Sequence, residues 1–94
     1  MSPDETENAR ALMVARFGVS CAAWLVWAHR RQLRRAGVVD LVIPGSADTP
    51  MWFALAVEYL RGRAHWAIDV LAQGDVRTFR LRWLVKRPYT LASA

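Results

Sequence analysis

The sequence has one cysteine, Cys21, and two histidines among 94 residues. A single cysteine excludes an intrachain disulfide and a multi-cysteine metal site within one chain. It is typical of a reducing compartment, so a cytoplasmic location is the simplest expectation. No nucleophile, base and orienting group can be assembled from the residues present, and we therefore expect neither an enzyme nor a bound cofactor.

The chain also has only one lysine, Lys86, so nearly all of its positive charge is arginine. Thirteen basic residues against eight acidic ones give a net charge of +5. The charges are segregated: residues 1–9 carry only acids, residues 10–36 carry six arginines and no acid, and residues 76–94 are again basic without an acid. Arginine presents a rigid fork of donors that suits carboxylates and phosphates. The codon usage of a GC-rich genome would produce the same preference.

Apolar residues, in contrast, are abundant. They make up 54% of the chain, and five of them are tryptophan. A domain of this size buries only about 60–65% of its unfolded surface, so its core is modest. Surplus apolar surface on a small chain indicates a protein partner, self-association or a membrane.

The pattern predicts one long N-terminal helix over residues 1–36. Ser2 and Pro3 suit its first turn, and Gly37 suits its end. At 1.5 Å per residue such a helix would be roughly 50 Å long, so we expect a break near Gly18 or a protruding end. Residues 11–28 are apolar nearly all round, which is typical of a helix buried in protein or in lipid. They approach the ~20 residues needed to span a bilayer, but Arg16 would cost about 2.5–3.5 kcal/mol there, so a membrane is the less favoured partner.

Three further elements follow. Residues 38–43 are a β-branched run that predicts a buried strand, and residues 50–61 predict a helix capped by Thr49. Residues 64–85 predict a β-hairpin, because Gly74-Asp75 suits a two-residue type II′ turn. Continuation of the second helix through residues 64–71 is the alternative. Residues 86–94 form a tail.

The hairpin turn fixes which residues face one another. Trp66 then lies opposite Trp83, Ile68 opposite Leu81 and Val70 opposite Phe79, all on one face. On the other face Asp69 lies opposite Arg80, Ala67 opposite Arg82 and Leu71 opposite Thr78. Since a one-residue slip would mix both faces, the register is well specified.

These elements predict a single α+β domain over residues 1–94. The order is long helix, strand, helix, strand, strand. We expect a small three-stranded mixed sheet in which the first two strands run parallel and the C-terminal hairpin adds an antiparallel strand.

Two possible chemical sites have simpler explanations. His65, Asp69 and Glu58 could share a metal on a helix, but on a hairpin Asp69 would pair with an arginine. The loop from Ile43 to Pro50 could hold an anion at a helix N-terminus, yet it lacks the lysine and glycines of a Walker motif.

We therefore expect a non-enzymatic interaction protein, a subunit, adaptor or inhibitor, that docks on a larger protein or on itself. Tryptophan and arginine most often anchor such interfaces. A nucleic-acid-binding module is the first alternative, and a single-pass membrane-anchored accessory protein is the second. The candidate binding residues are Trp24, Trp27, Arg30, Arg31, Arg34, Arg35, Arg80, Arg82, Lys86 and Arg87.

Overall fold

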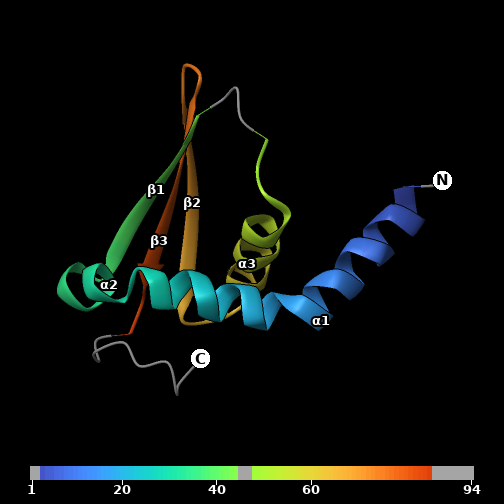
Figure 1. The fold of residues 1–94 in the computed structure, drawn as a ribbon, viewed down its shortest axis with the longest axis horizontal. Helices are drawn as coiled ribbons and strands as arrows, with labels where there is room; N and C mark the ends of the chain where they lie inside the picture. The colour runs from blue at the N-terminus through green and yellow to red at the C-terminus, as the bar shows by residue number, and fades with distance from the viewer. Residues whose placement is uncertain (1–2, 45–47, 86–94) are drawn as a thin grey trace.

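The structure is a computed structural model, and it describes residues 3–44 and 48–85. The elements follow the chain as α1 (Pro3–Ala28), α2 (Arg30–Ala36), β1 (Val38–Pro44), α3 (Met51–Arg61), β2 (Trp66–Gln73) and β3 (Val76–Trp83). The three strands form an open sheet, and α1 and α3 cross each other at the end of the sheet away from the hairpin turn (Figure 1). The protein is therefore of the α+β class, as predicted.

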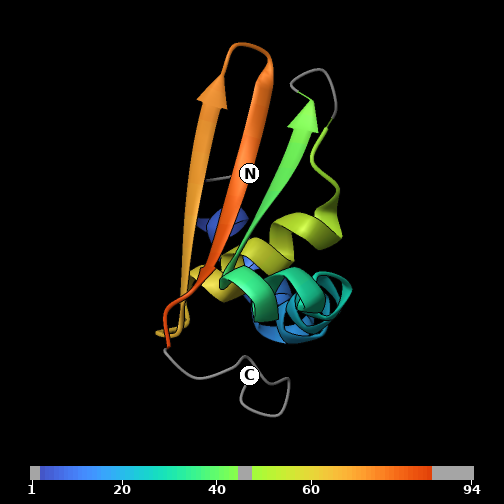
Figure 2. The ribbon, with the colours of Figure 1, turned by 90° about the vertical axis from the view of Figure 1, so that its left-hand side faces the viewer.

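The sheet order is β1-β3-β2, and every neighbouring pair is antiparallel. The expected mixed sheet is therefore wrong. The strands β1 and β2 do run in the same direction, but β3 lies between them (Figure 2). In this position β3 is hydrogen-bonded on both sides, and its polar residue Arg80 lies between Asp40 and Asp69.

The predicted hairpin register is confirmed residue by residue. Trp66 pairs with Trp83, Ile68 with Leu81 and Asp69 with Arg80. At the turn, Gly74 has φ +60°, and no residue other than glycine has a positive φ in the described chain. A positive φ confined to the first turn position is what a type II′ turn requires.

The N-terminal helix breaks at His29 instead of near Gly18. At the break the His29 amide donates to the Val26 carbonyl, three residues back, which tightens the turn. The Arg30 guanidinium donates to the Trp27 carbonyl at 2.8 Å and so replaces the missing main-chain donor. The second segment, α2, ends at Gly37 as predicted, with φ +72° and an amide bond to the Leu33 carbonyl.

Gly18 has a different role from the predicted break. It is buried where α1 crosses α3, and a Cβ at this position would lie 2.9 Å from the Cβ of Tyr59. Close approach of two helices at a glycine maximises contact between their backbones and neighbouring side chains. The other part of the expectation, a protruding end, is observed, because the first turns of α1 extend away from α3 and the sheet (Figure 1).

The core lies where α1, α2 and α3 meet the half of the sheet that is away from the hairpin turn. Leu25 of α1, Leu33 of α2, Ala56 of α3 and Leu81 of β3 are almost completely buried. The half of the hairpin nearest its turn has no helix over it, and Val70 is consequently half exposed although it lies on the predicted core face.

The helix α3 begins at Met51, and Thr49 is not its N-cap, because Pro50 occupies that position without a side-chain cap.

Candidate interaction surface

The face of α1 turned away from α3 carries a row of five side chains, of which all but Ser20 are large. Met13, Phe17, Ser20, Trp24 and Trp27 follow one another at alternating spacings of four and three residues. Side chains at this spacing line one side of a helix. Trp24 is 60% exposed, and Phe17 and Trp27 are 46% and 43% exposed. We call these five residues the outward stripe.

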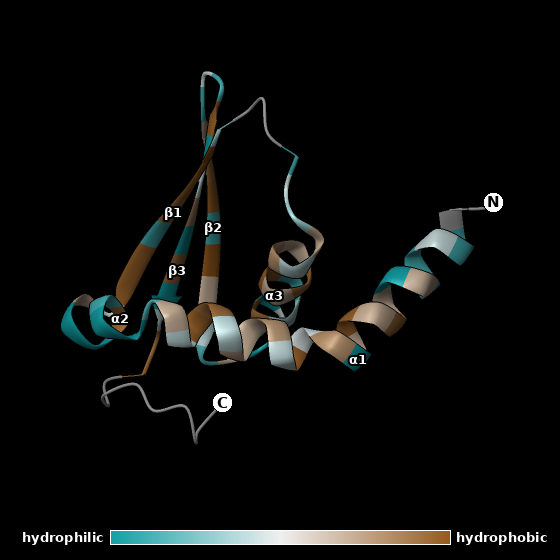
Figure 3. Ribbon diagram, viewed as in Figure 1, coloured by the Kyte–Doolittle hydropathy of each residue, from teal (hydrophilic) through white to brown (hydrophobic). Residues whose placement is uncertain are grey.

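The opposite side of α1 is apolar as well, and it is covered. Gly18, Ala22 and Leu25 are buried in the contact with α3 and the core. The helix therefore has two apolar sides, of which the body of the protein covers only one. Figure 3 shows the resulting colouring, in which white and brown segments predominate along the C-terminal half of α1 while α2 is teal. The two apolar sides of α1, one buried and one exposed, account for residues 11–28 being apolar nearly all round.

The tryptophan end of the stripe is held by its own contacts. The rings of Trp24 and Trp27 are stacked, with centroids 5.6 Å apart and an angle of 20° between planes. The Arg30 guanidinium lies 4.2 Å from the centroid of Trp27 while it also bonds the Trp27 carbonyl. A cation over an aromatic face contributes about 0.5–1 kcal/mol at an exposed site. These contacts limit the rotamers of Trp27 before any partner binds.

The arginines of α2 continue the surface beyond the stripe. Arg30, Arg31 and Arg35 line a shallow hollow together with His29 and Gln32. We call Arg30, Arg31, Arg34 and Arg35 the arginine cluster. Among the described residues, no carboxylate forms an ion pair with any of the four. The cluster is thus a solvated positive patch adjoining two exposed indole rings.

The predicted arginines of the hairpin are in a different situation. Arg80 and Arg82 lie on the outer face of β3, and each is paired with an acid. Arg80 makes two bonds to Asp40 of β1, at 2.9 and 3.2 Å. These bonds lower the pKa of the Asp40 carboxyl and raise the pKa of Arg80.

Asp69 lies opposite Arg80 in the register but forms its ion pair with Arg82, at 3.2 Å. The predicted ion pair for Asp69 is therefore present, and its partner is the diagonal arginine because Arg80 is bonded to Asp40. The hairpin arginines and the arginine cluster lie on different elements. Lys86 and Arg87 lie outside the described residues, as do residues 45–47 of the loop between Ile43 and Pro50.

The residues considered for metal binding are dispersed. Glu58 contacts Arg10 and Arg61, and the His65 ring lies beside Trp83. The described residues contain no group of three or more potential metal ligands. Cys21 is half-buried and packs against the core.

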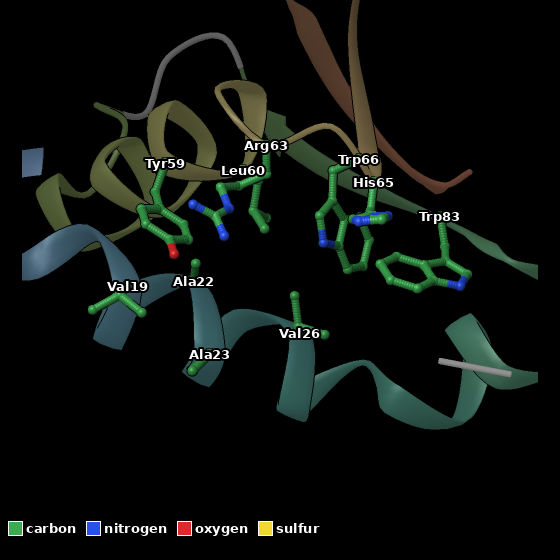
Figure 4. Close-up of a pocket in the computed structure, with 10 residues that line it drawn as sticks. All are labelled: Val19, Ala22, Ala23, Val26, Tyr59, Leu60, Arg63, His65, Trp66 and Trp83. Atoms are coloured by element: carbon green, nitrogen blue, oxygen red, sulfur yellow. The ribbon is translucent and has the colours of Figure 1, made fainter. Parts of the chain in front are cut away.

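A pocket that the sequence did not predict lies between α1, α3 and the start of β2 (Figure 4). Its volume is about 100 Å³, and Ala22 and Ala23 form one wall. Tyr59, Trp66 and Trp83 form the aromatic walls, with Arg63 and His65 at the rim. The only sequence signal for it is the pair of small residues on α1, which leaves space beneath larger rings.

One described helix, over Asp4–Ala28, is long and apolar enough to cross a membrane by length and composition. The core helix of a soluble protein and an N-terminal signal sequence meet the same criteria. Part of this segment packs against α3, and 22% of its apolar window is buried. No protein-family model, curated protein or solved structure matches the chain.

Proposed function

We propose that this protein is a non-enzymatic interaction protein that docks through the outward stripe of α1. The observation that carries the proposal is the uncovered apolar side of α1, with Phe17, Trp24 and Trp27 each more than two-fifths exposed. Such a row of large exposed side chains along one helix face costs solubility and has no role in the core described above. Exposed apolar patches of this kind mark surfaces that another molecule covers.

The composition of the patch supports this function. Tryptophan and arginine are the residues most often found as interface anchors. Here they adjoin each other, because Arg30 contacts Trp27 and the arginine cluster follows directly. The stacking of Trp24 on Trp27 reduces the rotamer entropy that would be lost when a partner binds.

Photo-crosslinking in cells tests the proposal. A benzoyl-phenylalanine at Phe17 is expected to give a strong covalent adduct, with a second copy or with another molecule. The matched control carries benzoyl-phenylalanine in place of Val42, which is 62% exposed on the outer face of the sheet. Adducts no stronger at Phe17 than at Val42 would contradict a docking role for the outward stripe.

Nucleic-acid binding is the second candidate, and the arginine cluster favours it, because its four guanidinium groups form no ion pair with described carboxylates. Binding would be electrostatic, so affinity should fall steeply with salt as counterions are released. The double variant Arg31→Ala, Arg35→Ala should lose about two phosphate contacts, so the slope of log affinity against log salt concentration should become correspondingly shallower. Arg80→Ala is the control, since Arg80 is already paired with Asp40. Lack of retention on duplex or single-stranded DNA at low salt would eliminate this candidate.

A further inference from the structure

We infer that the occupant of the outward stripe is a second copy of this chain, with the two α1 helices packed antiparallel. The inference rests on the proposed docking role of this surface and names its partner. Alternating spacings of three and four residues are those of the a and d positions of a two-helix coiled coil. One turn toward the N-terminus the same spacing reaches Arg10, whose guanidinium lies 3.6 Å from the Glu58 carboxylate of α3.

The stripe is symmetric about the midpoint between Gly18 and Val19. An antiparallel copy centred there places Met13 opposite the partner's Trp24 and Phe17 opposite the partner's Ser20. Arg10, which is ion-paired with Glu58 of its own chain, comes opposite the partner's Trp27. Large residues thus meet small or flexible ones in every layer, as close packing of two helices requires. A parallel copy would instead place Trp24 against Trp24 and Ser20 against Ser20.

The charges at the helix ends favour the same arrangement. Asp4, Glu5 and Glu7 lie in the first two turns of α1, and the arginine cluster lies just beyond its last turn. In an antiparallel pair the acidic end of each helix is next to the basic end of the other, and the helix dipoles are opposed.

The available area is sufficient for a dimer. Aromatic side chains bury about 150–250 Å² each, so the exposed fractions of Phe17, Trp24 and Trp27 correspond to roughly 300 Å² per chain. A stable interface covers about 800 Å² per partner, so the three rings alone supply more than a third. The remainder would come from flanking positions along a helix of 26 residues.

Arg16 distinguishes a second copy from lipid. Its guanidinium lies 5.4 Å from the centroid of Phe17, beside the middle of the stripe. In a coiled coil this position is at the rim, where the charge stays in water. In a bilayer the same charge would lie near the centre of the apolar segment, where it is costly.

Cross-linking between two singly substituted chains tests the arrangement. On a Cys21→Ser background, one chain carries Met13→Cys and the other, made distinguishable by a mass tag, carries Trp24→Cys. A cross-linker that reaches about 8–10 Å, the distance between packed helix axes, should join only the mixture. Each variant alone should give no product, because identical positions are about 16 Å apart along an antiparallel pair. In the mixed dimer the Trp24 of the first chain still packs on the Met13 of the second, so one of the two Met13–Trp24 layers is intact.

The mass of the purified chain provides the second measurement. Sedimentation should give twice the 10.7 kDa of one chain. Trp24→Glu should weaken dimerisation at least about 100-fold, because the anchor is lost in both copies. Val42→Glu is the exposed control and should leave the mass unchanged. Far-UV circular dichroism verifies folding, and Ser20→Glu serves as an independent disrupting variant.

Two results would overturn the inference. Cross-links formed by Met13→Cys or Trp24→Cys alone would show a parallel pair. A monomer at about 100 µM would exclude the dimer, and flotation of that monomer with phosphatidylserine vesicles would assign the stripe to lipid. A monomer that still cross-links through Phe17 to another protein in cells would exclude self-association while leaving the proposed docking function intact.

Discussion

The contact between Trp66 and Trp83 gives the most direct test of how this fold is held together. The two rings lie across neighbouring strands with centroids 5.1 Å apart and planes inclined at 60°, an edge-to-face arrangement. Trp66 is buried and Trp83 is half-buried. Such a pair contributes about 0.5–1.5 kcal/mol beyond the area it buries. We therefore expect a measurable coupling energy between the two positions.

The perturbation is Trp66→Leu and Trp83→Leu, separately and together. Truncation of a buried tryptophan to alanine costs about 3–5 kcal/mol, and leucine should retain part of that, so Trp66→Leu is expected to cost about 2–3 kcal/mol. Trp83→Leu should cost less because its ring is partly solvated. The double variant should be less destabilised than the sum of the two single variants by the coupling energy.

Urea denaturation followed by far-UV circular dichroism, at one protein concentration, measures these free energies of unfolding. Fluorescence is unsuitable because the substitutions remove up to two of the five tryptophans and so change the signal itself. The control cycle combines Trp66→Leu with Val42→Ala, on the outer face of the sheet, and should be additive within about 0.5 kcal/mol. If the tryptophan cycle is equally additive, the two rings do not interact and the reasoning from the hairpin register fails.

Three other substitutions test separate features. Gly18→Ala should destabilise the protein by up to about 2 kcal/mol, because the cost of overpacking against Tyr59 exceeds the gain of about 1 kcal/mol in helix propensity. Thermal unfolding measures the change, and a more stable variant would contradict the close helix contact. Gly74→Val should cost about 1–2 kcal/mol through its positive φ alone, since nothing lies within 4 Å of an added Cβ, and an unchanged urea midpoint would refute this. The pKa of Asp40 is lowered in the folded state by Arg80, so its stabilising contribution is present above the unfolded-state pKa and is lost as the pH falls through the folded-state pKa. Acid titration of Asp40→Asn should lack that small loss, and a titration identical to wild type would show that the pair does not contribute.

The hairpin could be predicted because its information is local. Gly74-Asp75 specifies the turn, and the turn fixes which residues oppose each other. Each face then confirms the other, since Trp66 meets Trp83 while Asp69 meets Arg80. The C-terminus of α2 was predictable for the same reason, because Gly37 alone adopts the left-handed conformation there.

The sheet order depends on residues far apart in the chain. The strand β1 contains one charged residue, Asp40, and the arginine that it pairs with in the neighbouring strand, Arg80, lies forty residues away in the chain. Gly18 was misinterpreted because a glycine marks both helix breaks and close contacts, and the choice depends on Tyr59. The break at His29 has no glycine or proline signal and is accompanied by a side-chain bond from Arg30 to the Trp27 carbonyl.

The location of the outward stripe was only partly foreseeable. Trp24 and Trp27 were predicted as binding residues, and the structure leaves both exposed. An apolar helix does not reveal from sequence alone which of its sides the protein covers. That information came from α3, whose contact with Gly18 and Ala22 fixes the rotation of α1 about its axis.

The junction after α2 has a consequence for how the arginine cluster could be substituted in evolution. Gly37 is held by main-chain bonds alone: its amide donates to the Leu33 carbonyl, and its carbonyl accepts the Trp83 amide, both at 2.8 Å. Only Leu33 anchors α2 through a buried side chain. Arg31, Arg34 and Arg35 could therefore be exchanged for other residues without moving the helix that carries them. The scaffold can remain constant while the chemistry of its exposed end is retuned for a different binding partner.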